Sequence, residues 1–302
     1  MDGYPKISVN VLGTNEKPKL GPCLTDLSRQ DYPNFEVTYI DNNSSDGSVE
    51  YVQNNFSHVK IIQKEKNEHY APAHNLGVAK TDGEYICILN SDIQLEPNFL
   101  SELIKPMLAD DKIAGVQGKL LRPDPVDGKY IFDGTGLTID RNRTVRDRYQ
   151  LQVDEGQYNE PGEVFAINGS SPLYRRAALM DVAIDGEVLD EDMQAYFDDS
   201  DLGWRIRHFG WKLWYQPTAI AYHERLVGQS SGGWKKFASF VKHRRSISVR
   251  NKKYAFKNHI FLIMKNDFDY PLRRDLPRIL FRELAMFGYT LIFDIKVLAV
   301  LP

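Results

Sequence analysis

The first third of the chain alternates short apolar runs of strand length with segments of helical character. The apolar runs are rich in β-branched residues and lie at 7–12, 35–40, 58–63 and 85–89. The helical segments between them lie at 19–29, 48–56 and 71–80. Strands separated by single helices indicate βαβ units and a mostly parallel sheet. We therefore expect an α/β fold whose ligands bind at the carboxyl ends of the strands.

Polar clusters follow three of the predicted strands. They are Gly13-Thr14-Asn15, the turn-forming run from Asp41 to Gly47, and Asn90-Ser91-Asp92. The second cluster suits a βα loop with a helix cap at Ser45 or Asp46, and Asp41, at the strand end, is free to accept from a base imide or a ribose hydroxyl. Asp92 either caps a turn or holds a hard cation. Mg²⁺ and Mn²⁺ take one or two carboxylates plus phosphate oxygens, so a metal–diphosphate complex needs few protein ligands.

Six acidic residues lie within the segment 190–201. A solvated helix start explains such a cluster, because acids favour helix N-termini. Apolar and aromatic side chains on both sides of the acids indicate instead that part of the segment faces a core. A carboxylate beside apolar walls and a second acid has a raised pKa, which suits a general base. His223, after a predicted strand at 212–222, is a structural histidine or a metal ligand.

Size and composition narrow the class of protein. The chain has 302 residues, 42% hydrophobic, which is enough for one large α/β domain with an appendage. Its net charge of −3 argues against a nucleic-acid partner. Cys23 and Cys87 lie far apart and are expected to be reduced thiols. The polar start at 1–6 predicts no secretory signal, and the Gly-, Asp- and Arg-rich segment 121–162 predicts a long insertion or mobile loop.

The composition changes beyond Gly228, which divides the chain into a domain at 1–227 and an extension at 228–302. The segment 234–254 contains eight Lys or Arg residues, interleaved with aromatic residues, and no acids. Such a segment suits a solvated helix, contact with phosphates, or an anionic lipid surface. The segment 278–301 is apolar but broken by charges, so we expect it to lie in a membrane interface or to form a homodimer contact rather than to span a bilayer.

The order of these motifs resembles family-2 glycosyltransferases with the GT-A fold, and within them rhamnosyltransferase-type enzymes of surface-polysaccharide assembly. The matching blocks are 7–11, 41–48, 75–77, 89–92, 197–205, 210–211, Pro217 and His223. The resemblance covers residues 5–265. It implies a Rossmann-like, mostly parallel central sheet flanked by helices, with a helical C-terminal extension.

The resemblance also assigns roles to individual residues. The nucleotide-sugar donor would be bound by Thr14, Asn15, Asp41, Asn43, Asn75, Asn90, Ser91 and Asp92. Asp92 and His223 would hold a divalent metal, Mn²⁺ or Mg²⁺, that bridges the donor diphosphate. Asp199 would be the catalytic base that deprotonates the acceptor hydroxyl, so that transfer inverts the anomeric centre. The acceptor side would be lined by Asn168, Gly169, Ser170, Asp198 and Trp204.

The chain departs from the family pattern at three places. The family's Asp-X-Asp metal motif reads Asn90-Ser91-Asp92 here. Asn90 therefore replaces its first acid, which puts the metal affinity in question. Asp198 is shorter than the usual glutamate beside the base. No Gln-X-X-Arg-Trp motif follows His223. Because that motif marks processive polysaccharide synthases, its absence favours transfer of a single sugar.

The function expected from the resemblance is therefore non-processive transfer from a dTDP- or UDP-linked sugar, with dTDP-rhamnose as one donor. The acceptor would be a glycan or lipid-linked hydroxyl used in cell-surface polysaccharide or glycoconjugate synthesis. The enzyme would act in the cytoplasm, peripheral at the inner face of the cell membrane. Two alternatives stay open. One is a catalytically inactive sugar-binding or scaffold protein, and the other is a sugar nucleotidyltransferase, whose basic phosphate loop the segment 13–19 fits poorly.

Overall fold

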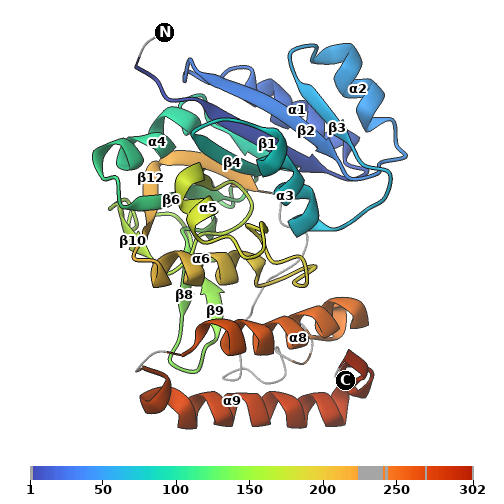
Figure 1. Ribbon diagram of the computed structural model, residues 1–302, viewed down its shortest axis with the longest axis vertical. Coiled ribbons are helices and arrows are strands. Elements are labelled where there is room, and N and C mark those ends of the chain that lie inside the picture. The colour runs from blue at the N-terminus through green and yellow to red at the C-terminus, as the bar shows by residue number, and fades with distance from the viewer. Residues whose placement is uncertain (1–2, 224–240, 242–243, 269–270, 301–302) are drawn as a thin grey trace.

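The computed structural model describes residues 3–223, 241, 244–268 and 271–300 (Figure 1). Its strands are β1 (Ile7–Gly13), β2 (Phe35–Asp41), β3 (Lys60–Gln63), β4 (Tyr85–Asn90), β5 (Ile93–Leu95), β6 (Ile113–Leu121), β7 (Phe132–Gly134), β8 (Leu137–Ile139), β9 (Val145–Asp147), β10 (Gly162–Val164), β11 (Leu173–Arg175) and β12 (Lys212–His223). Its helices are α1 (Lys17–Leu27), α2 (Ser48–Asn55), α3 (Tyr70–Lys80), α4 (Phe99–Ala109), α5 (Arg176–Asp181), α6 (Asp198–His208), α8 (Val249–Asn266), α9 (Pro271–Phe293) and the 3₁₀ segment η2 (Ile295–Val300).

One large sheet organises the α/β part, with strand order β10-β12-β6-β11-β4-β1-β2-β3. Its longest pairings, β1 with β2, β1 with β4, β2 with β3 and β6 with β12, are parallel. The short strand β11 inserts antiparallel between β4 and β6. The predicted α/β fold is confirmed, and β1, β2 and β4 lie within one residue of the expected runs.

Helices cover both faces of the sheet because its central strands are apolar on both sides. Along β4, Tyr85, Cys87 and Leu89 pack into a core with α1, α2 and α4. The alternate residues Ile86 and Ile88 pack into a second core with α3, α5 and α6. Successive strand residues point to opposite faces, so one strand contributes to both layers. Cys23 and Cys87 are buried free thiols, as expected.

The segment 121–162, expected to be a long insertion or mobile loop, contains three short strands. β7 pairs with β6, and β8 and β9 form a separate two-stranded hairpin. These strands have only three residues each, too few to show an alternating pattern in the sequence. Figure 1 shows the β8–β9 hairpin extending from the α/β part toward α8 and α9.

The C-terminal helices pack against this hairpin and against α6. Arg143, at the hairpin tip, is buried, and its guanidinium lies 2.6 Å from Asp267 and 3.1 Å from Asp275. Within the described residues, no helix is both long enough and apolar enough to cross a membrane. Of the predicted basic segment, residues 234–240 and 242–243 lie outside the described residues.

Candidate functional site

The carboxyl ends of β1, β2 and β4 meet at one edge of the sheet. The strand register places Gly13 beside Asp41 and Leu12 beside Asn90. Close approach favours Gly13 there, because a Cβ at this position would lie 3.0 Å from the Ser91 Oγ and 3.2 Å from the Tyr39 ring. The three polar clusters predicted from the sequence therefore share one edge, as expected for parallel strands.

Asn15 joins the first two of these loops. Its backbone N–H donates to Ser44 Oγ at 3.0 Å, and its Oδ1 accepts from the backbone N–H of Ser45 at 2.7 Å. Asn15 and Asn43 both have positive φ, 54° and 66°, which asparagine tolerates better than most residues. Thr14 lies next to Asn15 and is partly buried.

Asp41 is fully buried at the end of β2. Its carboxylate accepts from the Tyr39 hydroxyl at 3.1 Å and from the backbone N–H of Ser44 at 3.1 Å. The helix cap expected at Ser45 or Asp46 is instead Gly47, although Asp46 Oδ1 accepts from the backbone N–H of Ser48 at 3.0 Å. Contact between Asp41 and a nucleotide base or ribose stays a prediction.

Asp92 and His223 face each other from the end of β4 and the end of β12. The His223 Nε2 lies 3.7 Å from Asp92 Oδ2, and the other ring nitrogen, Nδ1, lies 2.8 Å from Asp133 Oδ2. A carboxylate only accepts, so Nδ1 donates to Asp133, and in the neutral imidazole this leaves the Nε2 lone pair on the side of Asp92. Asp92 Oδ1 is buried and has no hydrogen-bond partner among the described residues.

This pair fits a divalent cation that also binds phosphate oxygens. A buried carboxylate oxygen without a donor and an oriented imidazole are the chemistry of metal ligands. Within the described part of the chain, no three His, Cys, Asp or Glu side chains are grouped so as to hold a metal ion. The protein thus offers two ligands, and a bound diphosphate would have to supply others.

Asp198 and Asp199 begin α6, directly after an unusual turn. Tyr196 and Phe197 both have φ of 68°, a left-handed conformation that is rare for bulky residues. Two consecutive residues of this kind store strain, and such strain is concentrated at functional sites. The turn reverses the chain so that both acids enter the first turn of the helix.

Burial sets the protonation of these two acids. Burial, and after it the neighbouring Asp199, raises the pKa of Asp198. Burial, and after it the carboxylate of Asp147, raises the pKa of Asp199. The helix N-terminus favours the ionised forms, but desolvation outweighs it. Asp199 is oriented by the Ser200 hydroxyl at 3.0 Å and the Gly169 N–H at 3.4 Å.

The loop 168–170 connects the metal side of the site to these acids. The Ser170 carbonyl accepts from the backbone N–H of Asn90 at 2.9 Å, just before Asp92. Gly169 donates to Asp199, and the Asn168 side chain donates to Asp147 at 2.9 Å. Ser170 Oγ is buried, and no described residue forms a hydrogen bond with it. The loop 168–170 thus connects Asn90, at the predicted donor side, with Asp199, the predicted base.

Two predicted site residues have structural partners instead. The Asn75 side chain exchanges hydrogen bonds of 2.8 and 2.9 Å with the backbone of Leu189, so it supports the segment that leads to the acids. The Trp204 ring packs edge-on against Phe165, with ring centroids 5.6 Å apart, and stacks near His208. Their roles in donor and acceptor binding remain predictions.

Several residues of the site were not expected from the sequence. Asp133, which orients His223, and Asp147, which lies near Asp199, come from the strands β7 and β9 in the segment taken for an insertion. Tyr70 donates its hydroxyl to the Gly169 carbonyl from the start of α3. Asn258 of α8 donates to backbone carbonyls of the turn before Asp198 and Asp199. None of them lies in a sequence pattern that marks a site, because their partners are distant in the chain.

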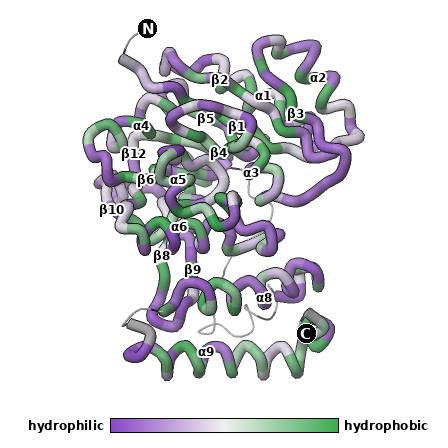
Figure 2. Tube along the Cα trace, viewed as in Figure 1, coloured by the Kyte–Doolittle hydropathy of each residue, from purple (hydrophilic) through white to green (hydrophobic). Residues whose placement is uncertain are grey.

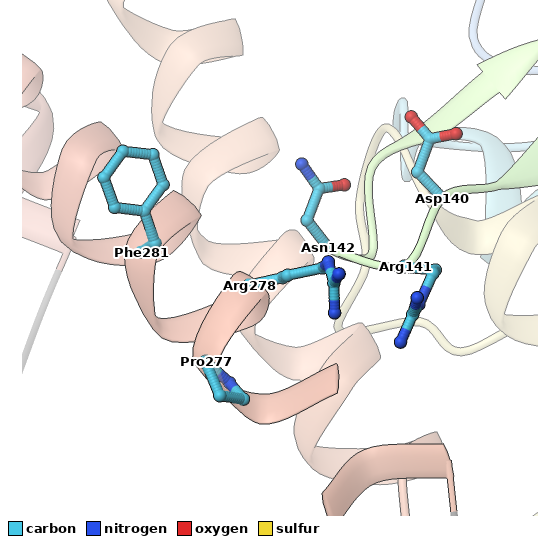
Figure 3. Close-up of a pocket in the computed structure, with 6 residues that line it drawn as sticks. All are labelled: Asp140, Arg141, Asn142, Pro277, Arg278 and Phe281. Atoms are coloured by element: carbon cyan, nitrogen blue, oxygen red, sulfur yellow. The ribbon is translucent and has the colours of Figure 1, made fainter. Parts of the chain in front are cut away.

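Two cavities lie outside the region connected by the loop 168–170. The larger, of about 650 Å³, lies between the tip of the β8–β9 hairpin and α9 (Figure 3). The smaller, of about 430 Å³, borders the second polar loop and α2. Its lining residues are Lys17, Ser44, Ser45, Gly47, Glu50, Tyr51, Asn54 and Asn55. The smaller cavity therefore adjoins the loops predicted to bind a donor, whereas the larger does not.

Comparison with known proteins finds similarity to glycosyltransferases. Residues 8–182 match the family model described as "Glycosyl transferase family 2". Poly-beta-1,6-N-acetyl-D-glucosamine synthase of Staphylococcus epidermidis is 23% identical over 241 residues, which cover 78% of this chain and 54% of that protein. Glycosyltransferase GlyG of Streptococcus pneumoniae is 31% identical over 135 residues, 43% of this chain and 44% of that protein. The chain spans about half the length of the curated relatives it matches.

Solved structures with low sequence identity share the fold. Staphylococcus aureus TarS superposes with a TM-score of 0.60 at 16% identity, over 98% of this chain and 49% of that one. A mannosyltransferase from Pyrobaculum calidifontis, solved with GDP-Man and Mn²⁺, gives 0.59 at 16% identity over 99% and 79% of the two chains. GalNAc-T7, solved with UDP, GalNAc and Mn²⁺, gives 0.59 at 18% identity over 76% and 46%.

Proposed function

The chain belongs to glycosyl transferase family 2 and has the GT-A fold, and from that premise we propose how this glycosyltransferase works. It moves one sugar from a nucleoside-diphosphate donor to an acceptor hydroxyl, with inversion at the anomeric carbon. The observation that carries the proposal is the loop 168–170. It ties Asn90, at the donor end of β4, to Asp199, the acid with a raised pKa at the start of α6.

Asp199 is the general base of this reaction. The acceptor oxygen attacks the anomeric carbon from the side opposite the diphosphate, its proton passes to the Asp199 carboxylate, and the bond from carbon to the diphosphate oxygen breaks. The Gly169 N–H and the Ser200 hydroxyl hold the two carboxylate oxygens of Asp199, which fixes the direction from which the proton is taken. A base with a raised pKa accepts that proton more readily than an exposed aspartate.

Asp92 and His223 would hold the divalent metal of the donor complex. Asp133 fixes the His223 ring so that Nε2 lies on the side of Asp92, and Asp92 would supply the buried oxygen that has no donor among the described residues. When bound, the cation neutralises the charge that develops on the leaving diphosphate. The Asn90 side chain cannot supply the charge of the usual first acid, so metal affinity depends on the donor phosphates.

The donor is a UDP- or dTDP-linked sugar, bound along the ends of β1, β2 and β4. Relatives and neighbours support a nucleotide-sugar, since TarS was solved with UDP-GlcNAc and the Pyrobaculum enzyme with GDP-Man. The finer assignment to a rhamnosyl donor rests on the motif resemblance. The acceptor is a glycan or a lipid-linked saccharide of cell-surface polysaccharide synthesis, at the inner face of the cell membrane.

One experiment tests the donor and the metal together. Titration calorimetry with UDP-, dTDP- and GDP-sugars, with Mn²⁺ and with a chelator, should identify one donor whose affinity depends on metal. An enzyme assay with that donor then measures transfer to saccharide acceptors. If none of the sugar nucleotides binds, the proposed function is wrong.

A sugar-binding protein without catalytic activity is the second candidate, and the substitution at Asn90 is the observation that favours it. Such a protein would bind a sugar nucleotide in the calorimeter. It would show neither transfer to an acceptor nor slow hydrolysis of the donor. Release of the free nucleoside diphosphate over time separates the two candidates.

A further inference from the structure

Helix α9 leaves one apolar face uncovered among the described residues. Its inward side chains, Ile279, Met286 and Tyr289, are buried. The outward apolar side chains are each at least 42% exposed and include Leu276, Leu280, Phe281, Leu284, Leu291 and Ile292. Figure 2 shows apolar segments along the whole of α9, at the far end of the molecule from the sheet. An uncovered apolar surface of this extent marks a contact site.

The acids of this C-terminal segment are mostly buried, whereas its exposed charged side chains are cations. Its three acids, Asp275, Glu283 and Asp294, each lie within ion-pair distance of a cation, and none has more than 26% of its side chain exposed. The exposed charged side chains of α9 and η2 are Arg273, Arg274, Arg278 and Lys296. The outer face therefore presents apolar groups flanked by cations, with no exposed acid among the described residues.

This sorting of charge argues against a second copy of the chain as the occupant. If two α9 helices paired in parallel, the arginines at the start of one would meet those of the other. If they paired antiparallel, the same arginines would meet Lys296 of the second copy. Either arrangement opposes like charges without an exposed acid on the face to offset them. An anionic lipid surface matches both the apolar face and the cations.

A cavity of about 650 Å³ lies at the start of the same face (Figure 3). Its lining residues are Asp140, Arg141, Asn142, Pro277, Arg278 and Phe281. Figure 3 shows Arg278 reaching from α9 toward Arg141 and Asn142 of the hairpin tip, with Phe281 one turn further along the helix. Arg141 is held by Asp275 at 2.7 Å, yet 48% of its side chain is exposed. Two guanidinium groups beside an aromatic ring suit a phosphate that is attached to an apolar chain, and the Asp140 carboxylate in the same lining is paired with Arg146 at 2.9 Å.

We propose that the outer face of α9, with the arginine-lined cavity at its start, docks on a membrane that contains anionic phospholipid. The cavity takes a headgroup phosphate, and the apolar side chains enter the interface between headgroups and acyl chains. The proposal deepens the membrane location given under the proposed function. Binding to lipid is nevertheless measured without any sugar nucleotide, so the two proposals can fail separately.

The test is flotation of the full-length chain with vesicles of phosphatidylcholine, alone or with about one third phosphatidylglycerol. The wild type should float only with the anionic vesicles, and salt should weaken the binding. The double variant Leu284→Glu/Ile292→Glu should bind at least about tenfold more weakly, because it places two charges in the apolar face. Arg278→Gln should weaken binding about fivefold, the effect of one surface cation.

Met264→Glu is the matched control, since Met264 is an exposed apolar residue of α8, and it should bind like the wild type. Equal binding of the wild type and the double variant would overturn the proposal, because another part of the chain would then account for attachment. The proposal also fails if the wild type stays unbound. A dimer in sedimentation analysis that the double variant converts to a monomer assigns the face to a second copy and equally overturns the proposal.

Discussion

At the scale of single residues, Asp198 and Asp199 are neighbours with different surroundings. Asp199 accepts from Gly169 and Ser200, whereas no side-chain donor contacts Asp198 among the hydrogen bonds of the described residues. Both have a raised pKa, mainly because the surrounding protein desolvates them, although only Asp198 is buried. A base with a raised pKa is protonated at acid pH, so kcat should rise with pH through a value above the ordinary aspartate range.

The raised pKa of Asp198 should cost stability. In the folded protein Asp198 keeps its proton above its ordinary value of 3.8, where the unfolded chain has already lost it, so the free energy of unfolding falls as pH rises through this window. Asp198→Asn removes the effect. Its Tm should exceed that of the wild type at about pH 8 and approach it at about pH 4. A Tm difference that does not change with pH contradicts this assignment.

Asp92→Ala tests the metal ligands without requiring turnover. Loss of the carboxylate should weaken donor binding in the presence of Mn²⁺ by about tenfold or more. Affinity in the presence of a chelator should be unchanged, because only the metal-dependent part is lost. Asp133→Asn leaves both ligands in place but weakens the hydrogen bond that orients His223. It should therefore reduce the affinity for the donor with Mn²⁺ by less than Asp92→Ala. Wild-type affinity that is the same with and without chelator rules out the metal site.

At the scale of elements, α8 supports the strained turn that carries the acids. The Asn258 side-chain amide donates to the carbonyls of Ala195 and Tyr196, at 2.7 and 3.0 Å, and Asn258 is fully buried. The ring of Phe197 packs edge-on against His259 of the same helix, with centroids 5.4 Å apart. We infer that α8 holds the turn, and through it Asp199, in position.

Asn258→Ala should therefore lower kcat by about tenfold or more, since small displacements of a base are costly. Donor affinity should be unchanged. The acid limb of the kcat profile should move to lower pH, because water that enters beside the acids lowers their pKa.

Asn266→Ala is the matched control on the same helix. Asn266 is also buried and donates to Asp201 at 2.8 Å, but it does not contact the turn. Both variants should lose about 1–3 kcal/mol of unfolding free energy, and only Asn258→Ala should change the pH profile. If both variants change the pH profile of kcat in the same way, α8 affects catalysis only by stabilising the fold and does not position Asp199.

The elements that the sequence predicts well are those with local signals. β1, β2 and β4 are apolar runs that end at polar turns, and α6 begins at the acids. β7 and β9 carry no such signal, so Asp133 and Asp147 could not be recognised. Their roles come from pairings with residues that are far away in the chain, as with Asp133 and His223. The left-handed turn at 196–197 was equally hidden, because aromatic residues disfavour that conformation.

At the scale of the whole molecule, the donor region and the membrane face belong to different parts of the chain. The donor region lies at the strand ends of the α/β part, and the membrane face lies on α9, which Figure 1 shows beyond α8 from the sheet. The buried pairs of Arg143 with Asp267 and Asp275 connect the two parts. The boundary predicted at residues 227 and 228 remains a prediction, because it lies outside the described residues.

In the proposed reaction, Asp199 removes the acceptor proton during sugar transfer. The most direct measurement is the initial rate of transfer by Asp199→Asn at saturating donor, with donor affinity measured by calorimetry on the same preparation. The rate should fall at least about a hundredfold, because an amide cannot take the proton, while donor affinity stays at the wild-type value. Transfer by Asp199→Asn at the wild-type rate would show that Asp199 is not the base.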